Sequence, residues 1–91
     1  MTEYIQIEPE ATDDPGEMRL ITNLTLSEGR EVYRSADEGE EGSALAQALF
    51  NVPGLAALTI EGPAIRIRAD ADTEWHDLIE DISAALKDFF L

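Results

Sequence analysis

Hydrophobic and polar residues change their spacing within residues 43–68, and the rest of the chain can be placed around this stretch. Three apolar positions in its first part recur three and four residues apart, namely Leu45, Ala48 and Leu49. This spacing is typical of one face of a helix. Ser43 can cap such a helix through its hydroxyl, and Pro53 disfavours a helical conformation at the residue before it. We therefore predict a helix of about two turns, which needs packing against the rest of the chain to be stable.

The second part of the stretch alternates between apolar and polar residues. The apolar set is Ala56, Leu58, Ile60, Ile65, Ile67 and Ala69, and the polar set between them is Thr59, Glu61, Arg66 and Arg68. A period of two is typical of strands with one buried face. Gly62 and Pro63 separate the two runs and favour a turn. The pattern predicts a β-hairpin whose solvent-facing side carries both acids and arginines.

Shorter segments precede this unit. Residues 3–8 alternate and predict a first strand, and Pro9 to Gly16, with two prolines, one glycine and three acids, predicts a loop. Residues 17–26 and 30–35 predict a second and a third strand. Ser35 and Glu38 have the spacing of a capping box, which predicts one helical turn that Gly39 should end.

The final segment shows the clearest periodicity. Between Thr73 and Phe90 the apolar residues repeat at three and four, and acids fill the opposite side. The apolar set is Trp75, Leu78, Ile79, Ile82, Leu86 and Phe89. This predicts an amphipathic helix, capped by Asp72 or Thr73, whose apolar side packs on the sheet. We expect Trp75 and Phe89 to make the largest contributions to that packing.

Together these segments predict one α+β domain that spans residues 1–91 in the order β-β-β-α-β-β-α. A chain of 91 residues has room for a single core. The strands come in runs rather than alternating with helices, so we expect two layers, with a mainly antiparallel sheet and two helices packed on one of its faces.

The formal charge is −14, from 20 Asp and Glu against 6 Lys and Arg. Such a surface repels phosphate backbones and anionic lipids, so we expect neither nucleic acid nor a membrane as a partner. No apolar run approaches the roughly 20 residues of a membrane span, and the first residues lack a signal-peptide pattern, so a cytoplasmic location is expected. A solubilising surface is the simplest interpretation of the charge, with a basic partner or DNA mimicry as alternatives.

Groups suited to catalysis or metal binding are few. The chain has no cysteine, which removes thiolate chemistry and cysteine-ligated metals. Asp70, Asp72 and Glu74 are spaced like the start of a calcium loop, but Trp75 stands where that loop needs glycine, so a helix start explains these acids better. His76 is the only histidine and is expected to be exposed. A pair of catalytic carboxylates stays open, although no spacing singles out two. We therefore predict no enzyme, and no catalytic, cofactor-binding or metal-binding residue.

Several short motifs follow one another over nearly the whole chain. They are Ile5-Gln6-Ile7-Glu8 with Pro15, Glu17-Met18-Arg19-Leu20, Tyr33 to Glu38, Ser43 to Gln47 with Leu49-Phe50, Val52 to Leu55, Ile65 to Arg68, and Glu74-Trp75 with Leu78. In this order and spacing the chain resembles the N-terminal domain of the Nfu/NifU-type iron–sulfur scaffold proteins. Full-length members carry a second domain whose Cys-x-x-Cys binds the cluster. The resemblance therefore implies a free-standing N-terminal domain that cannot ligate a cluster by itself.

The same resemblance implies a non-catalytic protein-interaction module associated with iron–sulfur cluster assembly or delivery. Its partner would be a cluster scaffold or an apo-target, and we expect a monomer without cofactor. The open face of the sheet or the Pro9–Gly16 loop would dock the partner, and the candidate interaction residues are Asp13, Asp14, Pro15, Arg66 and Arg68. The two arginines either offset nearby acids or anchor a partner's carboxylates. The alternative function is a small acidic mimic or inhibitor that binds a basic protein by charge. A carboxylate-based hydrolase would require a cleft that holds an acid of raised pKa.

Overall fold

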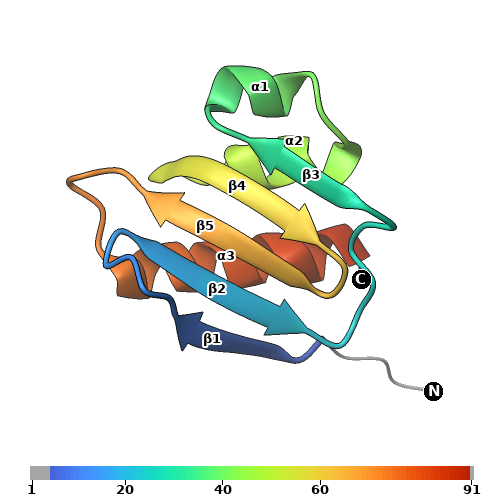
Figure 1. The fold of residues 1–91 in the computed structure, drawn as a ribbon, viewed down its shortest axis with the longest axis horizontal. Coiled ribbons are helices and arrows are strands. Elements are labelled where there is room, and N and C mark those ends of the chain that lie inside the picture. Colours follow the sequence, from blue (N-terminus) through green and yellow to red (C-terminus); the bar gives the residue numbers. More distant parts are fainter. Residues whose placement is uncertain (1–4, 91) are drawn as a thin grey trace.

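The computed structural model describes residues 5–90, which form one sheet of five strands and three helices (Figure 1). The strands are β1 (Ile7–Ala11), β2 (Glu17–Thr22), β3 (Arg30–Tyr33), β4 (Leu55–Glu61) and β5 (Ala64–Ala69). The helices are α1 (Ala36–Glu40), α2 (Ala44–Phe50) and α3 (Trp75–Phe90). The predicted α+β class is confirmed, and the order β-β-β-α-α-β-β-α contains one helix more than we expected.

Strands that are distant in the sequence are neighbours in the sheet. The order across the sheet is β1-β2-β5-β4-β3, and every neighbouring pair is antiparallel. The predicted hairpin of β4 and β5 is confirmed, and it lies between β2 and β3, with Gly62 in its turn at a positive φ of 59°. That backbone conformation is accessible to glycine without steric cost. Because β5 lies at the centre, its solvent-facing residues have neighbours on both sides.

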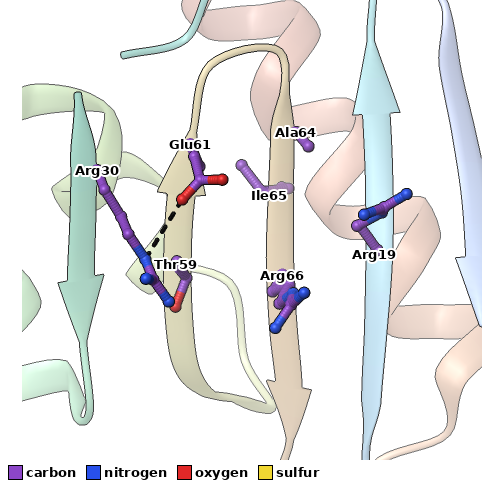
Figure 2. Close-up of a pocket in the computed structure, with 7 residues that line it drawn as sticks. All are labelled: Arg19, Arg30, Thr59, Glu61, Ala64, Ile65 and Arg66. Atoms are coloured by element: carbon purple, nitrogen blue, oxygen red, sulfur yellow. Dashed lines mark ion pairs between the residues drawn. The ribbon is translucent and has the colours of Figure 1, made fainter. Parts of the chain in front are cut away.

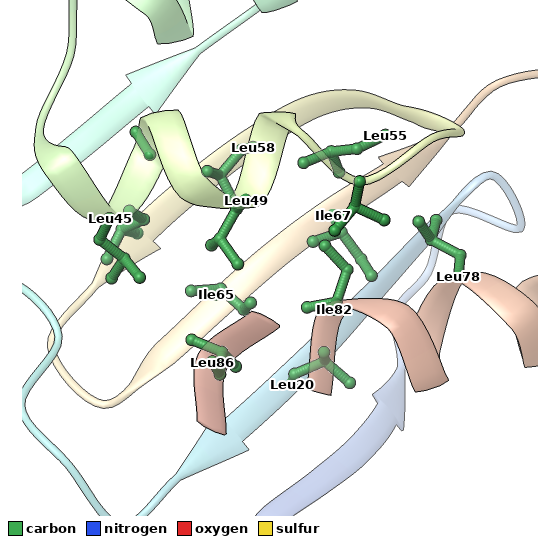
Figure 3. Packing of buried hydrophobic residues seen from close by; sticks show 13 residues of the cluster. Leu20, Leu45, Leu49, Leu55, Leu58, Ile65, Ile67, Leu78, Ile82 and Leu86 are labelled. Carbon is green, nitrogen blue, oxygen red and sulfur yellow. The ribbon is translucent and has the colours of Figure 1, made fainter. Parts of the chain in front are cut away.

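The core lies between the sheet and the helices α2 and α3, which are both behind the sheet in Figure 1. Figure 3 shows side chains from the two layers meeting there. The largest fully buried side chains are Leu20, Leu49, Leu58, Ile60, Ile65, Ile67, Leu78, Ile82 and Leu86. The predicted packing of two helices on one face is therefore confirmed. Within residues 5–90, no helix covers the opposite face of the sheet, which stays open to solvent.

The capping box predicted at Ser35 and Glu38 starts a helix that is longer than expected. The Glu38 N–H donates to Ser35 Oγ at 3.3 Å, and the Arg34 N–H donates to Glu38 Oε1 at 3.3 Å. Gly39 does not end α1 but lies within it, buried. A Cβ placed on Gly39 would meet Phe50 Cδ2 at 2.1 Å, so the missing side chain makes room for that ring. The glycine therefore serves the contact between α1 and α2.

Tyr33 joins the end of β3 to the start of α2. Its hydroxyl accepts a hydrogen bond from the Ser43 N–H at 3.2 Å and donates one to Glu31 Oε1. The ring of Tyr33 also packs edge-on against Phe50, with centroids 6.3 Å apart. Ser43 caps α2 as predicted, since its Oγ accepts from the Ala46 N–H at 3.2 Å. These contacts hold the two short helices against the edge of the sheet.

Three expectations about element boundaries are wrong. The first strand begins at Ile7 and continues to Ala11, so Pro9 to Ala11, predicted to be loop, belong to it; residues 3 and 4 of the predicted strand lie outside the described residues. Pro9 is tolerated because β1 is an edge strand, where one side of the backbone needs no ladder hydrogen bond. The second strand ends at Thr22, and the third ends at Tyr33.

The C-terminal helix forms as predicted but differs at its two ends. The helix begins at Trp75, so its N-cap residue is Glu74 rather than Asp72 or Thr73. The Glu74 carbonyl accepts a hydrogen bond from the Leu78 N–H at 3.1 Å. Phe89 is 42% exposed, and Trp75 is only partly buried, so neither leads the packing. The helix packs mainly through its fully buried leucines and isoleucine.

Candidate functional site

The open face of the sheet collects most of the positive charge of an acidic molecule. Four of the six cations, Arg19, Arg30, Arg66 and Arg68, lie on β2, β3 and β5, on the side opposite the buried residues of these strands. The helix layer differs, because the exposed residues of α1 and α3 are rich in Asp and Glu. The molecule therefore presents two chemically different layers.

Strand pairing arranges this face in rows. One row crosses all the described strands in the order Glu10, Arg19, Arg66, Thr59 and Val32. A second row runs parallel to it through Glu8, Ile21, Ala64, Glu61 and Arg30. The first row places two arginines directly opposite each other, which the sequence alone did not reveal.

Each arginine of the face also has an acidic neighbour. Two pairs link adjacent strands, with Arg19 Nη2 2.8 Å from Glu10 Oε1 and Arg30 Nε 3.4 Å from Glu61 Oε2. Glu17 forms two more, with its carboxylate 3.9 Å from Arg66 Nη1 and 3.6 Å from Arg68 Nη2, and Arg68 also pairs with Asp14. Both partners of the Arg19–Glu10 and Arg30–Glu61 pairs are well exposed, so each of these two pairs contributes only about 0–1 kcal/mol to stability.

A hollow of about 180 Å³ lies between three of the arginines (Figure 2). It is lined by Arg19, Arg30, Thr59, Glu61, Ala64, Ile65 and Arg66. The figure shows Arg30 beside Thr59 on the β3 side, Arg66 in the middle and Arg19 on the far side of β5. The side chains of Thr59 and Ala64 are short, so they form the floor of the hollow, and the longer arginine side chains surround it.

A second hollow, of about 330 Å³, lies beside the first over the loop between β1 and β2. Its lining is acidic on the loop side and shares Arg19 and Arg66 with the first hollow. Asp13 and Pro15 are exposed in this loop, as a docking role would require. The loop and the open face therefore form one continuous surface rather than two separate candidates.

Asp14 holds the loop against the sheet. Its Oδ1 accepts from the Gly16 N–H at 2.9 Å, and its Oδ2 accepts from Arg68 Nη2 at 2.5 Å. The hydrogen bond from Arg68, followed by the one from the Gly16 backbone, lowers the pKa of Asp14 below its ordinary value. The same contact raises the pKa of Arg68. Two of the predicted interaction residues thus bond to each other, and their first role is to shape the loop.

The structure therefore divides the predicted interaction residues. Asp13 and Pro15 lie exposed in the loop, Asp14 and Arg68 are paired with each other, and Arg66 lines the first hollow. Arg19 and Arg30 were missed. The alternation of β2 does place Arg19 on a polar side, but only the pairing of β2 with β5 reveals its neighbour.

One carboxylate outside this face also has a perturbed pKa. The hydrogen bond that the Tyr33 hydroxyl donates lowers the pKa of Glu31 below its ordinary value. A catalytic acid would need a raised pKa instead. Within residues 5–90, no three Asp, Glu or His side chains gather in a way that could hold a metal ion. His76 is exposed on α3, with Nε2 3.6 Å from Glu80 Oε2.

None of the helices in the described part of the chain is long and apolar enough to cross a membrane.

Comparison with solved structures shows what this fold resembles. A NifU-like protein from Saccharomyces cerevisiae, solved by NMR in solution, superimposes with a TM-score of 0.76 at 23% sequence identity, covering 97% of this chain and 82% of that one. The crystal structure of protein SAV1430 from Staphylococcus aureus gives a TM-score of 0.70 at 14% identity, covering 89% and 98%. No curated protein sequence matches the chain.

The family described as "scaffold protein Nfu/NifU N terminal" matches residues 5–91, nearly the full length. This match agrees with the motifs found along the sequence and with the shared fold. The chain belongs to the Nfu/NifU N-terminal domain family.

Proposed function

We propose that this domain is a non-catalytic protein-interaction module of iron–sulfur cluster assembly or delivery, which docks a cluster scaffold or an apo-target. Membership of the Nfu/NifU N-terminal family is the observation that carries the proposal. The absence of cysteine from the sequence supports a docking role over a cluster-binding one, because thiolates are the usual ligands of these clusters.

The open face of the sheet is the docking surface in this proposal. In the described part of the chain no helix covers this face, which carries four arginines on a molecule of charge −14 and joins the exposed loop that contains Asp13 and Pro15. The helix layer supplies the core and an acidic exterior. A partner that met the open face would therefore meet a surface that differs from the acidic exterior of α1 and α3.

The test mixes the purified domain with a cluster-bearing scaffold and an apo-target. We expect a complex in size-exclusion chromatography with light scattering, and a rate of cluster transfer that changes when the domain is added. Transfer is followed by the visible absorbance and circular dichroism of the cluster. Neither a complex nor a changed rate with either protein would contradict the proposal.

A second candidate function rests on the acidic helix layer. The exposed acids of α1 and α3 are Asp37, Glu38, Glu40, Asp77, Glu80, Asp81 and Asp88. A basic protein could bind this layer by charge alone, as an acidic mimic or inhibitor does. Such binding should collapse as salt rises and should be insensitive to Arg66→Gln, which distinguishes it from docking at the open face.

The proposal includes two further sequence-based expectations, that the domain acts as a monomer and that it acts in the cytoplasm. Light scattering of the isolated chain tests the first, where a mass of about twice 10.0 kDa would contradict it. Cell fractionation with an antibody to the chain tests the second.

A further inference from the structure

The arginine pair at the centre of the open face is unusual for a structural feature. Arg19 and Arg66 are direct cross-strand partners on β2 and β5. Like charges that face each other across two strands destabilise a sheet. Arg19 is paired with Glu10 at 2.8 Å, whereas the ion pair of Arg66 within residues 5–90 is with Glu17 at 3.9 Å, so Arg66 is the less compensated of the two. An anion between the two guanidinium groups would remove the repulsion.

The hollow beside this pair has the size of a side chain. Its volume of about 180 Å³ is smaller than the roughly 300–1,000 Å³ of pockets that bind free small molecules. Thr59 and Ala64 form its low part, and the hydroxyl of Thr59 is a further hydrogen-bond donor. Guanidinium groups match carboxylates with paired hydrogen bonds. The hollow is therefore suited to a carboxylate side chain that a larger partner presents.

The arginines are spaced to meet more than one carboxylate. Arg66 and Arg19 lie on neighbouring strands, while Arg30 lies two strands from Arg66 on the other side. Strands are about 4.8 Å apart, so the three span about 14 Å across the sheet. In an extended segment, alternate side chains project to the same side about 6.6 Å apart. Arg19 and Arg66 lie in the first row and Arg30 in the second, so a segment with acids at every second position would meet all three by crossing the strands obliquely.

Carboxylates fit the surroundings better than phosphates do. Glu10, Glu17 and Glu61 stand among the arginines and pair with them. A phosphate group carries close to two negative charges, which these acids would repel more strongly than a carboxylate with a single charge. Nucleic acid is disfavoured further by the total charge of −14.

We infer that the hollow bounded by Arg19, Arg30 and Arg66 binds the carboxylates of an extended acidic segment of a partner protein. This rests on the proposed docking function and adds the chemistry of the bound segment. It also separates the arginines by role, because Arg68 is engaged by Asp14 while Arg66 faces the hollow.

The test uses the full chain and a capped seven-residue peptide that alternates serine with three glutamates. In ¹H–¹⁵N NMR titrations we expect shift changes concentrated at Arg19, Arg30, Thr59, Ala64 and Arg66. Arg66→Gln and Arg19→Gln should each weaken binding about two- to fivefold. Lys87→Gln removes one positive charge from α3 and should leave the affinity unchanged. Thermal melts of each variant verify that it is folded.

Several outcomes would overturn the inference. Shift changes on the helix layer, equal affinities for wild type and Arg66→Gln, or equal binding of a peptide with glutamine in place of glutamate would each do so. A phosphoserine version that binds more than tenfold tighter would show a phosphopeptide site instead.

Failure of this inference is distinguishable from failure of the proposed function. If a cluster scaffold or apo-target forms a complex that Arg66→Gln does not weaken, docking stands and the assigned segment is wrong. If the peptide binds the hollow but neither cluster-assembly protein forms a complex or changes transfer, the site stands and the assembly role is wrong.

Discussion

Replacing Gly39 with alanine sets two physical effects against each other. In an isolated helix the change would stabilise α1 by up to about 1 kcal/mol, because glycine is a poor helix former. In this fold the new Cβ would lie 2.1, 2.5 and 2.9 Å from three ring atoms of Phe50. The ring must move, and overpacking of this kind costs about 1–3 kcal/mol.

Movement of the ring also disturbs its edge-on contact with Tyr33, a contact of about 0.5–1.5 kcal/mol. The balance is a net loss of about 0.5–3.5 kcal/mol for Gly39→Ala. For a domain of this length the loss corresponds to a Tm lower by roughly 2–28 °C. Thermal and urea unfolding followed by circular dichroism measures both quantities.

Two controls make the result specific. Gly29 has no atom within 4 Å of a built Cβ, so Gly29→Ala should leave stability within about 0.5 kcal/mol of wild type or raise it slightly. In a Phe50→Ala background the ring is gone, and Gly39→Ala should then be neutral or stabilising by up to about 1 kcal/mol. A Gly39→Ala protein as stable as wild type, or a penalty that persists without the ring, would refute the reasoning.

Three further predictions concern the sheet and its loop. The carboxyl ¹³C titration of Asp14 should give a pKa below its ordinary value of 3.8. The stability gained from its bond to Arg68 is therefore present above pH 3.8 and is lost as the pH falls through the lowered pKa. Arg68→Gln should move the pKa of Asp14 upward, and an unshifted pKa in the wild type would contradict this. Arg66→Thr removes a like-charge contact and should leave the free energy of unfolding unchanged or slightly higher. Ile67→Ala, at the neighbouring but fully buried position, should lower the free energy of unfolding by about 2–5 kcal/mol. A clear loss for Arg66→Thr in urea unfolding would show a structural role. Tyr33→Phe should lower the free energy of unfolding by about 1 kcal/mol, because the Ser43 N–H loses the hydroxyl that accepts its hydrogen bond. An unchanged free energy of unfolding in the same assay would contradict a role for this hydrogen bond.

Periodicity in the sequence was enough to predict the hairpin and the C-terminal helix, because each signal lies within one segment. Leu58 and Ile60 alternate with polar residues on β4, and Leu78, Ile82 and Leu86 recur at four on α3; all five are buried. Local capping chemistry also held, as Ser43 shows at the start of α2. The limits of these elements were correct to within one or two residues.

The expectations that failed depend on contacts between segments. Gly39 predicted the end of a helix, but it lies inside α1. The ring of Phe50, on another helix, occupies the space that a side chain at position 39 would fill. Pro9 predicted a loop, but proline is tolerated there because β1 is an edge strand. Neither fact is visible until neighbours in space are known.

The candidate site shows the same limit. The sequence pattern placed Arg66 on the solvent-facing side of a strand, and the structure confirms that Arg66 is exposed there. The grouping of Arg66 with Arg19 and Arg30 requires the order β2-β5-β4-β3, in which β2 and β5, distant in the sequence, become neighbours. The engagement of Arg68 by Asp14 likewise requires the β1–β2 loop to fold over β5.

We propose that the arginine-bearing face of the sheet docks a protein of iron–sulfur cluster assembly. The most direct measurement is the NMR footprint of a cluster scaffold, or of an apo-target, on the ¹⁵N-labelled domain, compared for wild type, the Arg19→Gln/Arg66→Gln double variant and Lys87→Gln. We predict line broadening over β2, β5 and the adjoining loop that the double variant reduces and Lys87→Gln does not. A footprint on α1 and α3, or no footprint with either protein, would contradict the account.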